Sequence, residues 1–204
     1  MLWISIIFQY LPLANRLNNQ LRIISGRYKS RLINIPDKPN LRPSKAFIRE
    51  TLFNVIDIGL CSSSLDLFSG SGILSFEALS RGIKSATLIE KDIDLVRSIK
   101  SNMSVLNIEG ASVIKSMVNK FLLSPDTGPY DIIFIDPPYN TSLLDETFQL
   151  LKNKNFLENN KYLYYEKSKK DKSGYEKYFN ETHNVIKDLS IGDVSYTILI
   201  NKNL

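Results

Sequence analysis

The tetrapeptide Asp136-Pro137-Pro138-Tyr139 has the residue types needed to hold a flat amine for alkylation. Proline donates no amide hydrogen, so two in succession end the ladder of a strand and leave acceptors at its end. The Asp136 carboxylate and the Pro137 carbonyl would then bind both N–H groups of an exocyclic amine and direct its lone pair at an electrophilic methyl carbon. Such positioning can remove roughly 7–11 kcal/mol of barrier, and stacking on Tyr139 would contribute about 1–3 kcal/mol. The simpler interpretation is a proline turn with a tyrosine packed over it.

A second motif is the glycine-containing turn Asp66–Gly72, which leads directly into a predicted helix. Gly70 and Gly72 permit a tight turn and a close approach of the backbone to a ligand. A dinucleotide fingerprint would need a third glycine where Ser75 stands, so the pattern disfavours NAD. A Gly-x-Gly sequence alone is also compatible with an ordinary strand–helix turn.

Two carboxylates strengthen the binding interpretation of this turn. Asp66, four residues before Gly70, would accept a hydrogen bond from an amine or from backbone amides. Glu90, twenty residues after Gly70, stands where an acid can accept both ribose hydroxyls. The alternatives are that Asp66 only caps the turn and that Glu90 pairs with Lys91. No Gly-Lys-Ser/Thr follows the turn, so the pattern indicates a nucleoside ligand without phosphates, which points to S-adenosylmethionine.

The elements that carry both motifs alternate between short apolar strands and helices. We expect strands at Ser64–Phe68, Ala86–Glu90, Ala111–Lys115, Asp131–Asp136, Tyr162–Glu166, Thr182–Asp188 and Ser195–Ile200. We expect helices at Ile73–Ser80, Asp92–Leu106, Ser116–Leu123 and Ser142–Leu151. This alternation is typical of an α/β fold, a mostly parallel seven-stranded sheet covered by helices on both faces. The last two strands should form an antiparallel hairpin, and both motifs should lie at the carboxyl edge of the sheet.

The first sixty residues have a different pattern. Residues 1–20 are predicted to be an extension outside the core, and residues 21–60 a basic segment that precedes the catalytic domain, residues 61–204. In the basic segment, strands at Leu21–Ser25 and Arg31–Ile35 are joined through Gly26, and a helix runs from an N-cap at Ser44 to Asp57.

Composition restricts the class of protein. The chain has 204 residues, 43% of them hydrophobic, which suits one compact domain with a small appendage. Its single cysteine, Cys61, excludes an internal disulfide framework and a zinc site with several thiolates. Its single histidine, His183, excludes a histidine-rich metal site. We therefore expect an intracellular protein without a metal.

The net charge of +5 is concentrated at the N-terminus. Residues 1–60 hold nine Lys/Arg and three Asp/Glu, whereas the remainder of the chain is nearly neutral. A basic arm on a neutral body favours a polyanionic partner such as nucleic acid, although a solvated surface is the alternative. Met1–Leu13 is apolar but too short to span a bilayer, and it lacks the features of a secretory signal, so we expect a cytoplasmic location.

Several sequence blocks, taken in order, resemble one known family. These blocks are Leu41–Ser44, Arg49–Asn54, Leu65–Gly72, Glu77–Gly82 and Asp136–Tyr139. Together they are similar to the bacterial RsmD-type methyltransferases, over about residues 21–200. The glycine turn and the Asp-Pro-Pro-Tyr motif occur in many methyltransferases, whereas Arg-Glu-Thr-Leu-Phe-Asn and Glu-Ala-Leu-Ser-Arg-Gly are more particular to this family.

The resemblance implies a Rossmann-like class I methyltransferase that transfers a methyl group from S-adenosylmethionine to guanine N2 in small-subunit (16S) ribosomal RNA. It implies substrate-amine binding by Asp136, Pro137 and Tyr139. The resemblance also implies cofactor binding by Asp66, Phe68, Gly70, Gly72, Glu90 and Met117. It implies RNA binding by Arg22, Arg27, Lys29, Arg31, Arg42, Lys45 and Arg49. The expected partner is an assembling ribosomal particle, and the expected oligomeric state is a monomer.

The chain departs from the family pattern at two places. Met117 stands where related sequences usually have Asp or Asn for the adenine amine, with Asn119 two residues on. Ser44–Phe47 replaces the usual Thr-Thr-Asp-Arg, which weakens the expectation of family-type RNA contacts there. Two alternatives stay open: an amine methyltransferase for DNA adenine or protein glutamine, and a noncatalytic RNA-binding assembly factor.

Other polar residues have simpler interpretations. His183 is expected on the surface, and Cys61 as an ordinary buried or loop thiol. The lysine run from Lys167 to Lys172 is expected to be a solvated loop, with contact to a phosphate backbone as the alternative. Glu166 would border the substrate cleft, and Tyr162–Tyr165 would belong to the sheet core.

Overall fold

The structure, a computed structural model, describes residues 20–37, 46–125, 128–139 and 141–204. Most of the predicted N-terminal extension lies outside these residues. The expected helix cap Ser44 and the predicted RNA contacts Arg42 and Lys45 lie outside them as well.

A seven-stranded sheet forms the centre of the fold, in the order β5-β4-β3-β6-β7-β9-β8. Its strands are β3 (Ser63–Asp66), β4 (Ser85–Glu90), β5 (Ala111–Lys115), β6 (Ile132–Ile135), β7 (Tyr162–Ser168), β8 (His183–Ile191) and β9 (Val194–Asn201). The first five run parallel, and β9 is antiparallel to both of its neighbours. The predicted mostly parallel sheet with a terminal hairpin is therefore confirmed.

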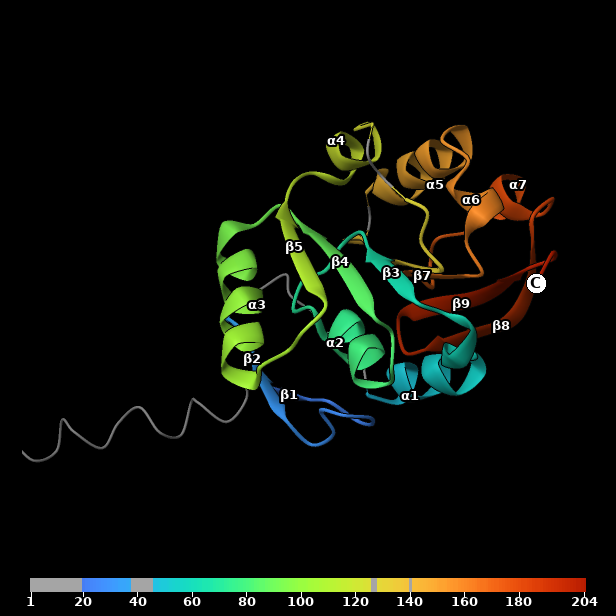
Figure 1. Cartoon of the computed structure of the whole chain (residues 1–204). Coiled ribbons are helices and arrows are strands. Elements are labelled where there is room, and N and C mark those ends of the chain that lie inside the picture. The colour runs from blue at the N-terminus through green and yellow to red at the C-terminus, as the bar shows by residue number, and fades with distance from the viewer. Residues whose placement is uncertain (1–19, 38–45, 126–127, 140) are drawn as a thin grey trace, which may run out of the picture.

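Helices cover both faces of this sheet, as Figure 1 shows. One face carries α1 (Ala46–Val55), α2 (Ile73–Ser80) and α3 (Ile93–Leu106), and the other carries α4 (Val118–Leu122), α5 (Leu143–Asn153), α6 (Phe156–Asn159) and α7 (Glu176–Phe179). Strand side chains alternate between the two cores. For example, Ile133 and Ile135 pack with α5, and Phe134 packs against α1. This two-sided burial explains why the strands are almost continuously apolar.

A small antiparallel hairpin, β1 (Gln20–Arg22) with β2 (Leu32–Asn34), packs beside α2 and α3. Its anchor is Glu77 of α2, a fully buried carboxylate that accepts the backbone N–H groups of Ile24 and Ser25 at 2.8 and 3.0 Å. Ser80 of the same helix accepts the Tyr28 backbone N–H at 2.9 Å. The block Glu77–Gly82 therefore holds the N-terminal segment on the sheet domain.

Three short helical turns were not predicted: the 3-10 helix η3 (Ile58–Leu60), α6 and α7. One to two turns are too short to show a helical period. The prediction of a surface His183 is wrong, because this residue begins β8 opposite Asn201 and is only 3% exposed. Cys61 is buried, as expected. No helix among the described residues is long and apolar enough to cross a membrane.

Candidate cofactor and substrate site

The two motifs leave neighbouring strands at the same edge of the sheet. Strands β3 and β6 are parallel partners, with Asp66 opposite Phe134. The strand order reverses between them, since β3 is followed outward by β4 and β5, and β6 by β7. Such a topological switch point leaves a crevice at the carboxyl ends of the strands, where ligands bind in open α/β sheets.

A cavity of about 1010 Å³ occupies this position. Its walls include the glycine turn (Asp66 and Phe68–Ser71), the end of β4 with Glu90, and the segment Asp136–Tyr139. Met117 and Asn119 close it from the side of α4, and Thr147 and Leu150 from α5. The two motifs therefore share one hollow, large enough for a nucleoside and a second flat group.

The backbone of the turn has the left-handed conformation that favours glycine. Gly70 and Gly72 have φ angles of 51° and 77°. A Cβ atom added at Gly72 would meet the side chains of Leu88, Phe76 and Ile99 at 3.3–3.4 Å, so this position is also tightly packed. The turn brings the chain over the end of the sheet and into α2.

Glu90 braces this turn. Its carboxylate accepts the backbone N–H of Gly70 at 2.9 Å and that of Asp92 at 2.8 Å. Within the described part of the chain, Glu90 forms no ion pair with Lys91, whose side chain is exposed. Each carboxylate oxygen has a second lone-pair site, so the brace and acceptance from a diol are compatible.

Asp66 lies at the bottom of the cavity and is 2% exposed. It accepts the Ser75 hydroxyl at 2.9 Å. Burial raises the pKa of Asp66 to about 7; the negative charge of Glu90 adds to the rise, and hydrogen bonds from Ser75 and the Phe68 backbone oppose it. A buried acid with a neutral-range pKa gains its charge when a cation or a strong donor binds beside it.

Two apolar side chains line the cavity near the glycine turn and α4. Met117 precedes α4 and is 58% exposed, and Phe68 is partly buried at the end of β3. Together with Asp66 and Glu90, they provide an apolar surface, a buried acid and a diol acceptor. Those groups fit the adenine, the positive charge and the ribose of S-adenosylmethionine.

The segment after β6 faces this set of groups. Pro137 is buried, and Asp136 and Tyr139 are partly exposed along the cavity wall. The Tyr139 hydroxyl donates to Glu166 of β7 at 3.1 Å. Glu166 is 2% exposed and also accepts the hydroxyl of Tyr164. Tyr139 is therefore tethered at its hydroxyl while its ring stands beside the cavity.

The predicted RNA contacts divide into two groups. Arg22, Arg27, Lys29 and Arg31 are exposed on the hairpin. Arg49 is instead 2% exposed and donates to the Arg22 carbonyl at 3.0 Å, so it is a buried support of the hairpin and not a surface contact. Burial lowers its pKa, against the opposing charges of Glu77 and Glu50.

Sequence reasoning missed the roles of two residues that organise this region. In the sequence, Glu77 is noted only as part of a family block. A lone acid within the mostly apolar stretch Ile73–Leu79 does, however, indicate a buried carboxylate whose oxygens accept hydrogen bonds. Glu166 is expected near the cleft, but its bond to Tyr139 joins residues 27 positions apart and leaves no sequence signal. Among the described residues, no group of three or more His, Cys, Asp or Glu could hold a metal ion.

Comparisons with known proteins agree with this geometry. The family model described as conserved hypothetical protein 95 matches residues 21–200. A relative named "Ribosomal RNA small subunit methyltransferase D" from Buchnera aphidicola is 41% identical over 156 residues, which is 76% of this chain and 82% of the relative. The protein of the same name from Escherichia coli K12 is 39% identical over 73% of this chain and 75% of its own length.

A solved structure shows the same fold. "Putative methyltransferase yhhF" from Escherichia coli is 32% identical and superposes with a TM-score of 0.74, covering 89% of this chain and 98% of that chain. The similarity thus extends over the hairpin and the sheet domain together.

Proposed function

Because this chain belongs to the family described as conserved hypothetical protein 95, we propose that it methylates the exocyclic N2 amine of a guanosine in small-subunit ribosomal RNA. The resemblance to the RsmD-type methyltransferases is confirmed by the family match and by the relatives of that name. The chain is a methyltransferase, and its methyl donor is S-adenosylmethionine.

The observation that carries the proposal is the shared cavity. The turn after β3 and the segment after β6 line the same hollow, so a donor and an acceptor held by the two motifs would be in contact. Holding two reactants in one orientation converts a bimolecular step into an effectively unimolecular one. This placement supports the site residues of the two motifs that line the cavity; Gly72 is not among the lining residues.

The chain's own residues would prepare the amine. The Asp136 carboxylate and the Pro137 carbonyl would accept its two N–H groups, and the ring of Tyr139 would stack on the flat base. Bound S-adenosylmethionine supplies a methyl carbon made electrophilic by its positive sulfur. Holding both hydrogens favours a pyramidal nitrogen. Its lone pair is then less delocalised into the ring and points at the methyl carbon. The alkylated amine is acidic, so Asp136 needs little basicity to receive its proton.

The substrate context follows from charge and from the relatives. Their names specify small-subunit ribosomal RNA, and the exposed hairpin residues Arg22, Arg27, Lys29 and Arg31 would contact its phosphates. We further propose that the chain acts as a monomer in the cytoplasm on an assembling particle. The target base must leave its stack, at a cost of a few kcal/mol, which stacking on Tyr139 would offset.

A transfer assay tests this proposal. Small-subunit particles from cells lacking the gene, free DNA and release-factor protein are each incubated with labelled S-adenosylmethionine, and the products are analysed by mass spectrometry. We expect one methyl group on the N2 amine of one guanosine. Transfer only to DNA adenine or to a protein glutamine would contradict the RNA substrate.

Variants of one acid test the role of the motif. Asp136→Ala should lower transfer by a factor on the order of 100, since it removes a hydrogen bond to a charged group. Calorimetry should show that the variant still binds S-adenosylmethionine. Glu181→Ala, at an exposed acid that does not line the cavity, is the control. Unchanged activity of the Asp136 variant would contradict the role of Asp136, whereas no transfer and no cofactor binding by the wild type would favour a noncatalytic assembly factor.

A further inference from the structure

A loop of residues 169–175, which we name the lysine loop, joins β7, the strand to which Tyr139 is tethered, to α7. We propose that its exposed lysines Lys169, Lys170 and Lys172 bind RNA phosphates next to the target nucleotide. This inference rests on the proposed function and adds a second RNA-binding surface to it, distinct from the basic hairpin.

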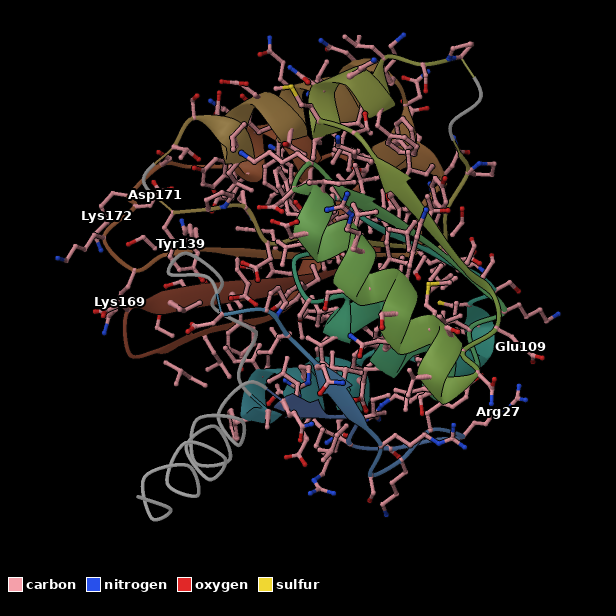
Figure 2. All side chains as sticks on the ribbon, turned by 90° about the vertical axis from the view of Figure 1, so that its left-hand side faces the viewer. Arg27, Glu109, Tyr139, Lys169, Asp171 and Lys172 are labelled. Atoms are coloured by element: carbon pink, nitrogen blue, oxygen red, sulfur yellow. The ribbon has the colours of Figure 1, made fainter. Side chains whose placement is uncertain are left out.

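The register of the sheet places the start of the lysine loop at the same edge of the sheet as the cavity. Ile135 of β6 is opposite Tyr165 of β7, so Asp136 follows at the level of Glu166. The hydrogen bond from Tyr139 to Glu166 fixes the end of the substrate motif against β7. The chain leaves β7 at Ser168, only two residues after Glu166. Figure 2 shows Lys169 and Lys172 on the same side of the molecule as Tyr139.

The lysine loop keeps a net positive charge, because it holds three lysines and one acid. Lys169, Lys170 and Lys172 are exposed, and none of them forms an ion pair in the described part of the chain. The acid among them, Asp171, accepts the Tyr175 hydroxyl at 2.7 Å and the Ser173 backbone N–H at 2.8 Å. Although burial opposes ionisation, these hydrogen bonds lower the pKa of Asp171. Asp171 is therefore committed to the loop's own structure.

The same contacts give the loop a defined shape. The Lys169 backbone N–H donates to the Asp193 carbonyl at 2.8 Å, which ties the loop to the β8–β9 turn. Lys167 lies over the Tyr175 ring at 5.3 Å and donates to the Ser173 carbonyl at 3.3 Å. A loop ordered in this way loses little conformational entropy when its lysines meet a phosphate backbone.

The tip of the basic hairpin lies away from the cavity. Arg27 pairs with Glu109 at 3.1 Å, and Arg31 donates to the Leu106 carbonyl, at the edge where β5 begins. Figure 2 shows Arg27 and Glu109 on the side of the molecule away from Tyr139. The hairpin tip and the cavity therefore lie at opposite edges of the sheet, whereas the lysine loop lies at the same edge as the cavity.

A charge-matched pair of triple variants tests the proposal. The loop variant is Lys169→Ala, Lys170→Ala and Lys172→Ala. The control is Lys84→Ala, Lys100→Ala and Lys154→Ala, which removes the same charge from exposed lysines that do not line the cavity. Affinity for small-subunit RNA particles, together with KM and kcat, is measured over a series of salt concentrations. Calorimetry with S-adenosylmethionine checks that both variants are folded.

We expect the loop variant to bind RNA at least about tenfold more weakly than the control near physiological salt. Its plot of log affinity against log salt should be shallower by about 0.7 for each phosphate that the loop no longer neutralises. KM should rise while kcat at saturation changes little. Equal affinities and slopes for the two variants would overturn the proposal. If the wild type transfers no methyl to RNA, the proposed function fails, and the RNA affinities still decide the role of the loop.

Discussion

Asp66 is a residue whose protonation should report on ligand binding. Its pKa of about 7 means that a proton is bound to much of the protein at and below neutral pH. A positively charged ligand beside it would lower that pKa and release the proton. The affinity for S-adenosylmethionine should therefore increase as pH rises through about 7 and level off above it.

The experiment that tests this is calorimetry on the wild type and Asp66→Asn in buffers of different ionisation enthalpy. The variant should bind more weakly, with no proton release from this site. An equal pH dependence in both proteins would exclude Asp66 as the titrating group.

Tyr139 combines two roles that substitutions can separate. Tyr139→Phe removes the hydroxyl bond to Glu166 and keeps the ring, whereas Tyr139→Ala removes both. Since base stacking contributes about 1–3 kcal/mol, Tyr139→Ala should lower kcat/KM by about 5- to 150-fold, and Tyr139→Phe by less. Steady-state kinetics on ribosomal particles would rank the two variants. Equal reductions in kcat/KM would mean that the hydroxyl bond to Glu166, not the ring, matters.

At the residue scale, what could be predicted depends on whether the signal is local. Asp136, Gly70 and Glu90 can be assigned to one site because each follows a strand that the sequence marks clearly. The burial of Arg49 could not be predicted, because it depends on a hairpin 27 residues away. The burial of His183 could not be predicted for the same reason, since its neighbours come from the end of β9 and the chain beyond it.

At the scale of elements, the hairpin depends on one glycine. Gly26 has a φ of +82°, and a Cβ there would lie 1.8 Å from the Ser80 carbonyl oxygen. Gly26→Ala should lower the free energy of unfolding by about 2–5 kcal/mol, from backbone strain plus the collision. Gly82→Ala is the control, since φ there is also positive but no atom lies within 4 Å. Urea unfolding compares the two, and equal destabilisation would contradict a tightly docked hairpin.

The buried His183 in strand β8 provides a second test of packing. Burial, and then the charge of Lys202, lower the pKa of His183 to about 4, below its ordinary value of 6.5. The unfolded chain therefore binds a proton that the folded chain does not, and stability should fall as pH decreases from about 6.5 to about 4. His183→Gln should lose less stability over that interval in urea titrations. An identical pH profile would mean that His183 is solvated in solution.

The longer elements could be predicted within a few residues because burial imposes a period on their sequences. Strand β5 and helix α2 have the predicted limits. Strands β7, β8 and β9 extend further than predicted, into polar residues such as Ser168 and Asn201. There the antiparallel ladder sets the strand ends, and polar side chains at an outer edge show no apolar pattern.

At the scale of the whole molecule, the fold separates two basic surfaces across one sheet. The excess charge of residues 1–60 predicts a single RNA-binding arm, yet the tip of the hairpin lies at the edge opposite the cavity. Composition reports how much charge a segment carries, and only the topology reports where it lies. The sequence could predict a ligand site such as the one at the switch point between β3 and β6, because open parallel sheets bind ligands at such points.

A crystal structure with S-adenosylhomocysteine and a guanosine would test the central claim most directly. We expect the ribose at Glu90, the adenine between Phe68 and Met117, and the sulfur facing a guanine N2 held by Asp136 and Pro137. A nucleoside bound elsewhere, or a sulfur turned away from Pro137, would contradict a shared donor and acceptor cavity.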